Sequence, residues 1–161
     1  MLEESMSLKI LLISFLLPTV FSAQGSVHVE GKLLCHGAPY AYERVQIFEK
    51  NYVLGDQKWA ETMTDENGRF SMKSFGEDWF SVTPYVYVPN YCGSEFSDGK
   101  RCTTGGIQIN VPGDLISPTH IPTAKFDVGT IALNSNSKRE LLGLGSIFGG
   151  ALAVTKECRD Y

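Results

Sequence analysis

The sequence predicts an all-β, disulfide-stapled, single-domain fold, a β-sandwich of about seven strands. Apolar and polar residues alternate with a period of two in several short segments, the pattern of strands with one buried face. Glycine and proline separate these segments, and no amphipathic helical pattern occurs before residue 138. Four cysteines follow the N-terminal leader, an even number that suits a disulfide-bonded protein.

Residues 1–23 are predicted to be a signal peptide. Lys9 precedes an apolar run over residues 10–21, and Ser22 and Ala23 are small residues suited to a cleavage site. The run is shorter than the roughly 20 residues of a membrane-spanning helix, which argues against the alternative of an uncleaved anchor. We therefore expect a secreted, extracellular protein with no transmembrane span.

The remaining chain divides into a predicted sandwich domain, residues 24–136, and a C-terminal extension, residues 137–161. The formal net charge is −4, and no basic cluster exceeds the pairs Lys100–Arg101 and Lys138–Arg139. Nucleic-acid binding is disfavoured, because such proteins carry basic patches that neutralise phosphates.

The first two strands are predicted at residues 27–33 and 45–47. Within the first, Val27, Val29 and Leu33 share one face, and polar residues occupy the other. A turn over residues 36–39 separates the two strands.

The next two strands are predicted to form a β-hairpin over residues 62–71. The dipeptide Asn67-Gly68 lies between the two extended segments, and both residues adopt positive φ with little strain.

A strand over residues 80–88 is predicted near a sheet edge, because Pro84 and Pro89 cannot donate ladder hydrogen bonds. Four of its apolar residues share one parity, namely Phe80, Val82, Val86 and Val88.

Two last strands are predicted at residues 107–111 and 126–133. In the second of these the apolar parity changes at Gly129, which predicts a β-bulge. Phe126 and Val128 precede the change, and Ile131 and Leu133 follow it.

The four cysteines allow three disulfide pairings. Cys92 and Cys102 bracket a loop rich in glycine, serine and charged residues, so we expect them to pair locally. That choice leaves Cys35 to bond Cys158 and tie the start of the domain to its end. A zinc site made by all four is the alternative, although the sequence has no CxxC pair.

Five stretches in order resemble the secreted transthyretin-like proteins of nematodes. They are residues 27–35 (VHVEGKLLC), 64–70 (TDENGRF), 89–92 (PNYC), 126–131 (FDVGTI) and 157–160 (ECRD). The resemblance implies a prealbumin-like sandwich, an extracellular location and use as a carrier, adaptor or signalling ligand. It does not imply hormone binding, which in true transthyretins needs a tetramer channel.

The resemblance also implies a fold shared with hydroxyisourate hydrolases, which need a His and Arg constellation and a Tyr-Arg-Gly-Ser ending. This chain ends Cys-Arg-Asp-Tyr, and His28, His36 and His120 are predicted on a wet strand face, in a turn and in a loop. We therefore expect no enzyme activity, with a hydrolase as the alternative.

No metal or cofactor is expected. The acidic residues fit no calcium-loop motif, and turn formation accounts for the nearest of them. The alternative, a calcium site, would use Glu61, Asp65, Glu66, Glu77 and Asp78.

Four large amphipathic rings are expected to cover the second face of the sandwich, and the alternative is a partner-contact surface beside the 92–102 loop, because such rings often anchor interfaces. These rings belong to Trp79, Tyr85, Tyr87 and Tyr91. The ligand expected is an extracellular protein, a cell surface or a small apolar molecule or lipid, and an oligomer is compatible with the sequence.

The apolar, glycine-rich segment Leu141–Val154 departs from the family pattern. It has 14 residues, too few to span a bilayer. Three interpretations stay open: an extra element packed on the sandwich, an exposed patch for membrane or partner contact, and a mispredicted gene segment.

Overall fold

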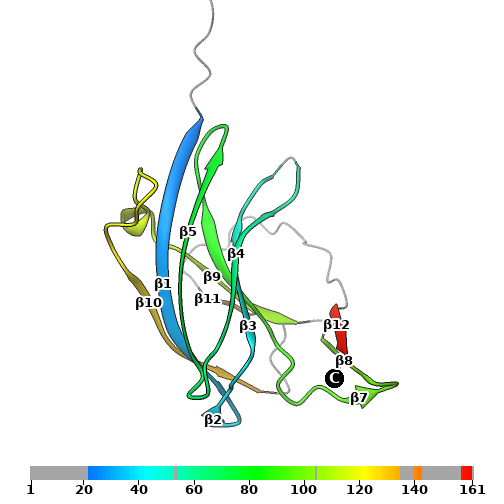
Figure 1. Ribbon diagram of the computed structural model, residues 1–161. Helices are drawn as coiled ribbons and strands as arrows, with labels where there is room; N and C mark the ends of the chain where they lie inside the picture. The colour runs from blue at the N-terminus through cyan, green and yellow to red at the C-terminus, as the bar shows by residue number, and fades with distance from the viewer. Residues whose placement is uncertain (1–21, 53, 104, 135–139, 143–156, 161) are drawn as a thin grey trace, which may run out of the picture.

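Two β-sheets packed face to face form the body of the protein (Figure 1). A computed structural model describes residues 22–52, 54–103, 105–134, 140–142 and 157–160. In the first sheet, β1 lies between β5, which is antiparallel to it, and β10, which is parallel to it, and β2 pairs with the end of β1. The bounds are β1 (Ala23–Cys35), β2 (Ala38–Pro39), β5 (Arg69–Asp78) and β10 (Phe126–Leu133).

The second sheet has the strand order β11-β9-β6-β3-β4, and a small third sheet has the order β12-β8-β7. The strands of the second sheet are β3 (Arg44–Glu49), β4 (Gln57–Met63), β6 (Pro84–Pro89), β9 (Gly106–Asn110) and β11 (Glu140–Leu142). Those of the third are β7 (Phe96–Ser97), β8 (Lys100–Thr103) and β12 (Glu157–Asp160), and a 3₁₀ turn covers Gly113–Leu115. The prediction of a β-sandwich of about seven strands is confirmed, because seven longer strands, β1, β3, β4, β5, β6, β9 and β10, build the two main sheets.

The core lies between the two main sheets, and the alternating residues of the predicted strands fill it. Val27, Val29 and Leu33 of β1 are fully buried, as are Val45 and Ile47 of β3. Each such side chain contributes about 1.5–3 kcal/mol through removal of apolar surface from water. The core members from the other strands include Phe70, Met72, Val86, Val88, Ile107, Ile131 and Leu133.

The predicted hairpin over residues 62–71 is wrong, because β4 and β5 belong to different sheets. The turn itself exists: Asp65 Oδ1 accepts hydrogen bonds from the Asn67 and Arg69 amides at 2.9 and 2.7 Å. Gly68 has a φ of +74°, and a Cβ there would lie 2.4 Å from the Leu33 carbonyl oxygen. The turn thus lies directly against β1, and through it the chain passes from β4 in one sheet to β5 in the other.

Strand β6 is central, which overturns the expectation of an edge position. It lies between β3 and β9, and Pro84 and Pro89 are its first and last residues. Proline costs least at a strand's end, where a missing amide interrupts no ladder. The predicted strand also began too early, since Phe80 and Val82 lie in the loop before β6.

The bulge predicted at Gly129 is confirmed. The β1–β10 register pairs Glu30 with Asp127 and then Lys32 with Thr130, so β10 has one extra residue there. Gly129 has a φ of +71°, and its amide donates to Asp127 Oδ1 at 2.8 Å. The extra residue moves Ile131 and Leu133 to the buried face.

The two disulfides join Cys35 to Cys92 and Cys102 to Cys158, so the predicted pairing is wrong. An Asp98-Gly99 turn with positive φ at both residues connects β7 and β8. It directs β8 toward β12, where Cys102 lies opposite Cys158 in an antiparallel pair. Cys35 ends β1 and Cys92 closely follows β6, so their bond ties the two main sheets together.

Each disulfide closes a long loop, with sequence separations of 57 and 56 residues. Closure of loops of this length destabilises the unfolded chain by about 4 kcal/mol in the chain-entropy model. The Cys35–Cys92 pairing can be tested directly. Non-reducing proteolysis followed by mass spectrometry should recover the peptide that contains Cys35 linked to the peptide that contains Cys92. A peptide pair containing Cys92 and Cys102 would contradict this pairing.

A buried ion pair holds the C-terminal strand β12 against the body of the protein. The Glu43 side chain has no exposed surface, and Arg159 donates to its two oxygens at 2.8 and 3.1 Å. The Arg159 guanidinium also lies 4.6 Å from the centre of the Tyr91 ring. Arg44 forms a second bond to β12, to Glu157 at 3.0 Å.

The substitution Arg159→Met should destabilise the oxidised protein by about 3–5 kcal/mol, because it leaves the Glu43 carboxylate buried without its cation. Urea unfolding measures this. Lys100→Met is the matched control, since the ion pair of Lys100 with Asp160 also holds β12, to β8, but at the surface. It should cost no more than about 1 kcal/mol, and equal losses for the two variants would show that the pair is not essential.

Candidate functional site at the apolar end of the sandwich

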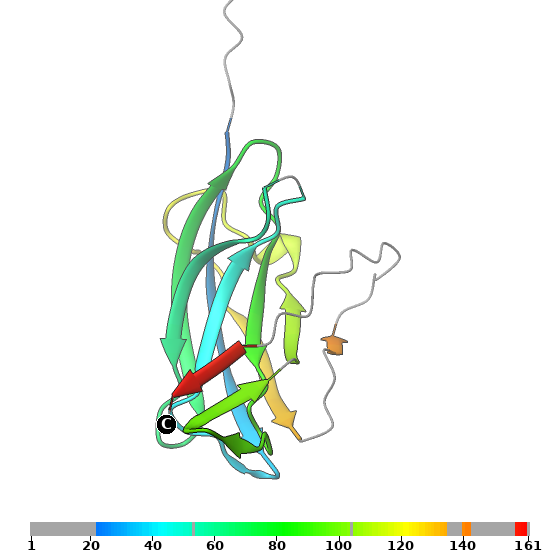
Figure 2. The same ribbon diagram turned by 90° about the vertical axis from the view of Figure 1, so that its right-hand side faces the viewer.

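Four large apolar side chains are exposed at one end of the sandwich. Tyr52 and Leu54, in the β3–β4 loop, are 80% and 85% exposed; Trp79 and Phe80, in the β5–β6 loop, are 73% and 90% exposed. We call these four residues the apolar end. Figures 1 and 2 show the two loops side by side, at the opposite end of the molecule from β2 and the small sheet.

Hydrogen bonds hold the two loops of the apolar end together. The Lys50 amide donates to the Thr83 carbonyl oxygen at 3.3 Å, and the Thr83 amide donates to Glu49 Oε1 at 2.6 Å. Within the β3–β4 loop, the Leu54 amide donates to the Asn51 side chain at 2.9 Å. The exposed rings therefore project from a braced base rather than from independent loops.

A pocket of about 340 Å³ lies between the two loops. Its lining is mainly apolar, with a few polar groups, which is the usual composition of a small-molecule site. The described lining residues are Lys50, Asn51, Tyr52, Leu54, Asp78, Trp79, Phe80, Ser81 and Thr83.

Glu49, whose carboxyl group accepts the hydrogen bond from the amide of the lining residue Thr83, is only 1% exposed. Among the described residues its Oε2 has no hydrogen-bond partner. Burial, the largest cause, raises the pKa of Glu49 to about 7 together with the charges of Asp78 and Asp56, against the effect of the hydrogen bond from the Thr83 amide. The base of the apolar end therefore holds a buried carboxyl group that keeps its proton up to about neutral pH.

The structure separates the four aromatic residues that were considered for a partner-contact surface. Tyr85 and Tyr91 are buried, and Tyr87 is half-buried. Tyr85 stacks on Phe48 with ring centres 5.6 Å apart. Of these four residues only Trp79 belongs to the apolar end. Partner contact therefore stays a prediction for Trp79, and the buried tyrosines are not available for it.

Sequence analysis missed three members of the apolar end, Tyr52, Leu54 and Phe80. Phe80 matched the parity of a strand and was placed in one, whereas the chain bends before Pro84 and exposes its ring. Between residues 50 and 59 the alternation of a strand is absent, which indicates a loop, and the apolar residues Tyr52 and Leu54 within that loop were the signal that could have revealed an exposed apolar surface.

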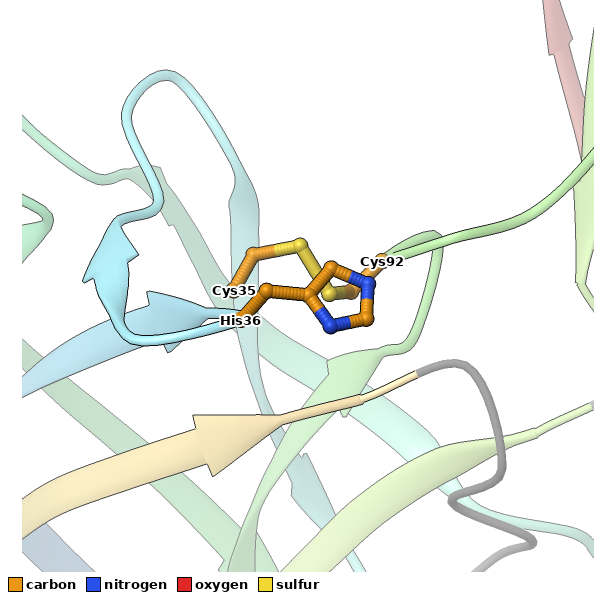
Figure 3. A group of neighbouring side chains, drawn as sticks. All are labelled: Cys35, His36 and Cys92. Atoms are coloured by element: carbon orange, nitrogen blue, oxygen red, sulfur yellow. A yellow bond between two sulfur atoms is a disulfide. The ribbon is translucent and has the colours of Figure 1, made fainter.

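Cys35, His36 and Cys92 form a compact group, shown in Figure 3. One ligand atom from each lies within 4.8 Å of the others. Both sulfur atoms belong to a disulfide, however, so neither offers the thiolate that binds zinc. In this oxidised state the group is structural, with the His36 ring packed beside the disulfide.

The three histidines have different surroundings. His28 shares a hydrogen bond of 3.0 Å with Ser71 Oγ, and partial burial lowers its pKa, as do the charges of Lys73 and Lys125 against that of Glu30. The His120 ring packs on Phe75, with centres 4.0 Å apart. Neither histidine joins a cluster of three metal-ligating side chains within the described ranges.

The acidic residues considered for calcium are dispersed. Glu61 contacts Gln46, Lys58 and Arg44, and these contacts lower its pKa, the Gln46 hydrogen bond most. Asp65 closes the turn before β5, and Asp78 lies at the far end of that strand. No calcium site is formed by the described part of this set.

A second groove, of about 630 Å³, runs beside β1, β10 and the 64–68 turn. Its charged groups have both signs, and Glu30 is already paired with Lys125 at 3.0 Å. The groove therefore presents neither a surface of one charge sign nor an apolar surface to a ligand.

Only Leu141 and Leu142 of the apolar C-terminal segment are described. They belong to β11, which pairs in parallel with β9. Residues 143–154 lie outside the described residues, so the three interpretations of this segment stay open. None of the described residues forms a helix long and apolar enough to cross a bilayer.

Comparison with known proteins decides the family. The model of the Transthyretin-like family matches residues 30–112, more than half of the chain. The chain belongs to the transthyretin-like family. The resemblance found in the sequence is thereby confirmed, and the sandwich is consistent with it.

Three relatives from Caenorhabditis elegans share this family name, and two of them illustrate the similarity. Transthyretin-like protein 46 is 29% identical over 138 residues, covering 83% of this chain and 75% of its own. Transthyretin-like protein 2 is 24% identical over 114 residues, covering 67% and 74%. Among solved structures, a 9R-lipoxygenase from Cyanothece aligns with 67% of this chain and 16% of its own, at 16% identity and a TM-score of 0.37.

The substitution Glu49→Gln should flatten the pH dependence of stability. Because the pKa of Glu49 rises from 4.5 to about 7 on folding, the folded state retains a proton that the unfolded state loses. The resulting stabilisation is complete below pH 4.5 and is lost as the pH rises through about 7.

Urea unfolding at pH 4.5 and at pH 8 measures this effect. The decrease in the free energy of unfolding between the two pH values should be about 3 kcal/mol larger for the natural protein than for E49Q. Glu95→Gln, at an exposed position away from the pocket, is the control and should keep the natural profile. Parallel profiles for the natural protein and E49Q would mean that Glu49 is ionised in the folded state.

Proposed function

We propose that this transthyretin-like protein is a secreted binding or adaptor protein that contacts its ligand through the apolar end. The observation that carries the proposal is the exposure of four large apolar side chains on two adjacent loops. Contiguous apolar surface is costly in water, and where it occurs it commonly serves a binding site. Tryptophan and tyrosine are also the residues that most often anchor interfaces.

The division of the molecule into two ends supports this assignment. Both disulfides and the buried Glu43–Arg159 pair lie away from the apolar end. A braced scaffold that presents exposed loops is a common arrangement of binding proteins, because the scaffold fixes the loops without using their side chains.

Secretion is part of the proposal. It is supported by the leader-like pattern of residues 1–23 and by two disulfides, which form and persist in oxidising compartments.

A second candidate function is the carriage of a small apolar molecule or lipid. The pocket of about 340 Å³ favours it, because a pocket adds to the exposed surface a volume that a ligand could fill.

The double substitution Trp79→Ser and Phe80→Ser should reduce ligand binding at least ten-fold, because it removes two anchors at the centre of the apolar end. The measurement is saturable binding of fluorescently labelled protein to cells and extracellular matrix of its native source.

Phe96→Ser is the matched control, since Phe96 is 59% exposed but lies in the small sheet at the other end. It should bind as the natural protein does. Unchanged binding by the double variant, or an equal loss in the control, would place the ligand elsewhere.

A further inference from the structure

The pocket at the apolar end combines aromatic rings with acidic groups. Tyr52, Trp79 and Phe80 supply ring surfaces, and Asp78 supplies a carboxylate in the lining. Aromatic faces carry negative electrostatic potential and attract organic cations, most strongly where water is excluded.

Two further carboxyl groups lie close to the pocket. Glu49 accepts a hydrogen bond from the amide of Thr83, which lines the pocket, and its interactions with the charges of Asp78 and Asp56 place the three groups in one region. Asp56 accepts hydrogen bonds from the Tyr85 hydroxyl and from the Asn51 amide. Within the described lining itself, Asp78 and Lys50 are the only charged residues, so Glu49 and Asp56 act from outside it.

Lys50 marks where a cation sits. Its ammonium nitrogen lies 4.9 Å from the centre of the Tyr52 ring, within the range of a cation–π contact. Tyr52 is 80% exposed, so this face of its ring is also within reach of a molecule from solution. The chain's own lysine thus occupies the position that a ligand ammonium group would take.

We propose that the pocket binds a small apolar molecule that carries an ammonium group, either an amine or a quaternary ammonium. This rests on the proposed function, and it names the ligand class of the same site. The ligand's cation replaces the Lys50 ammonium on the face of Tyr52 and faces Asp78, and its apolar part contacts Trp79, Phe80 and Leu54. An apolar anion such as a fatty acid fits less well, because the Asp78 carboxylate and the negative faces of the aromatic rings would oppose its charge.

The test compares two probes that share a ten-carbon chain and differ in the charge of the head group. Decyltrimethylammonium and decanoate are titrated below their aggregation concentrations into the full-length secreted protein, and isothermal titration calorimetry gives the affinities. We expect saturable binding of decyltrimethylammonium at least ten-fold tighter than that of decanoate. Equal affinity, or tighter binding of decanoate, would overturn the proposal.

Two substitutions with opposite expected effects localise the site. Lys50→Met removes the competing cation and should tighten decyltrimethylammonium binding at least three-fold, whereas Asp78→Asn should weaken it at least three-fold. Lys125→Met removes the same charge as K50M from the other sheet, where Lys125 pairs with Glu30, and should have no effect. If K125M tightens decyltrimethylammonium binding as much as K50M does, the change in affinity reflects only the net charge of the protein, and the proposed site is overturned.

A further arm distinguishes a free ligand from a lipid head group. Sedimentation with phosphatidylcholine vesicles that depends on Asp78 would assign the ammonium group to a membrane lipid, and binding of the soluble probe alone would assign it to a free molecule. If neither occurs while the Trp79 and Phe80 double variant still loses binding to its native source, the ligand class is wrong and the proposed function stands. If that variant binds normally, the proposed function fails as well.

Discussion

Glu43 has a carboxylate with no exposed surface, and the closing of the sandwich depends on how its charge is compensated. Removing a carboxylate from water costs several kcal/mol unless a cation and hydrogen bonds replace the lost solvent. Arg159 supplies the cation with a bidentate contact, and the Arg44 amide donates a further hydrogen bond at 3.0 Å. The last strand is therefore a required part of the structure rather than an appended tail.

The two disulfides hold the strands around this ion pair in place. The Cys102–Cys158 bond fixes β12 beside β8, and the Cys35–Cys92 bond fixes the two main sheets to each other. The opposite end is held by hydrogen bonds between two loops and leaves its apolar side chains in water. The disulfides and the buried ion pair thus lie at one end of the molecule, and the proposed ligand contacts lie at the other.

Local patterns predicted much of the fold, because the side-chain period of a strand is visible in sequence. Val27, Val29 and Leu33 were placed correctly on the buried face, and the parity change at Gly129 revealed the bulge. The disulfide pairing could not be predicted in this way, because it depends on where the Asp98-Gly99 turn aims β8. The apolar end was found only in part, since Trp79 and Phe80 look like core residues until the bend before Pro84 is known.

The parallel pairing of β1 with β10 also bears on how the chain acquires its structure. Val29 lies beside Phe126, nearly a hundred positions later, while the antiparallel neighbour β5 is far closer in sequence. Contacts between such distant positions need a large loop to close first, and they slow folding. A chain that emerges from its N-terminus can therefore form the β1–β5 ribbon early, but the first sheet stays incomplete until β10 has emerged.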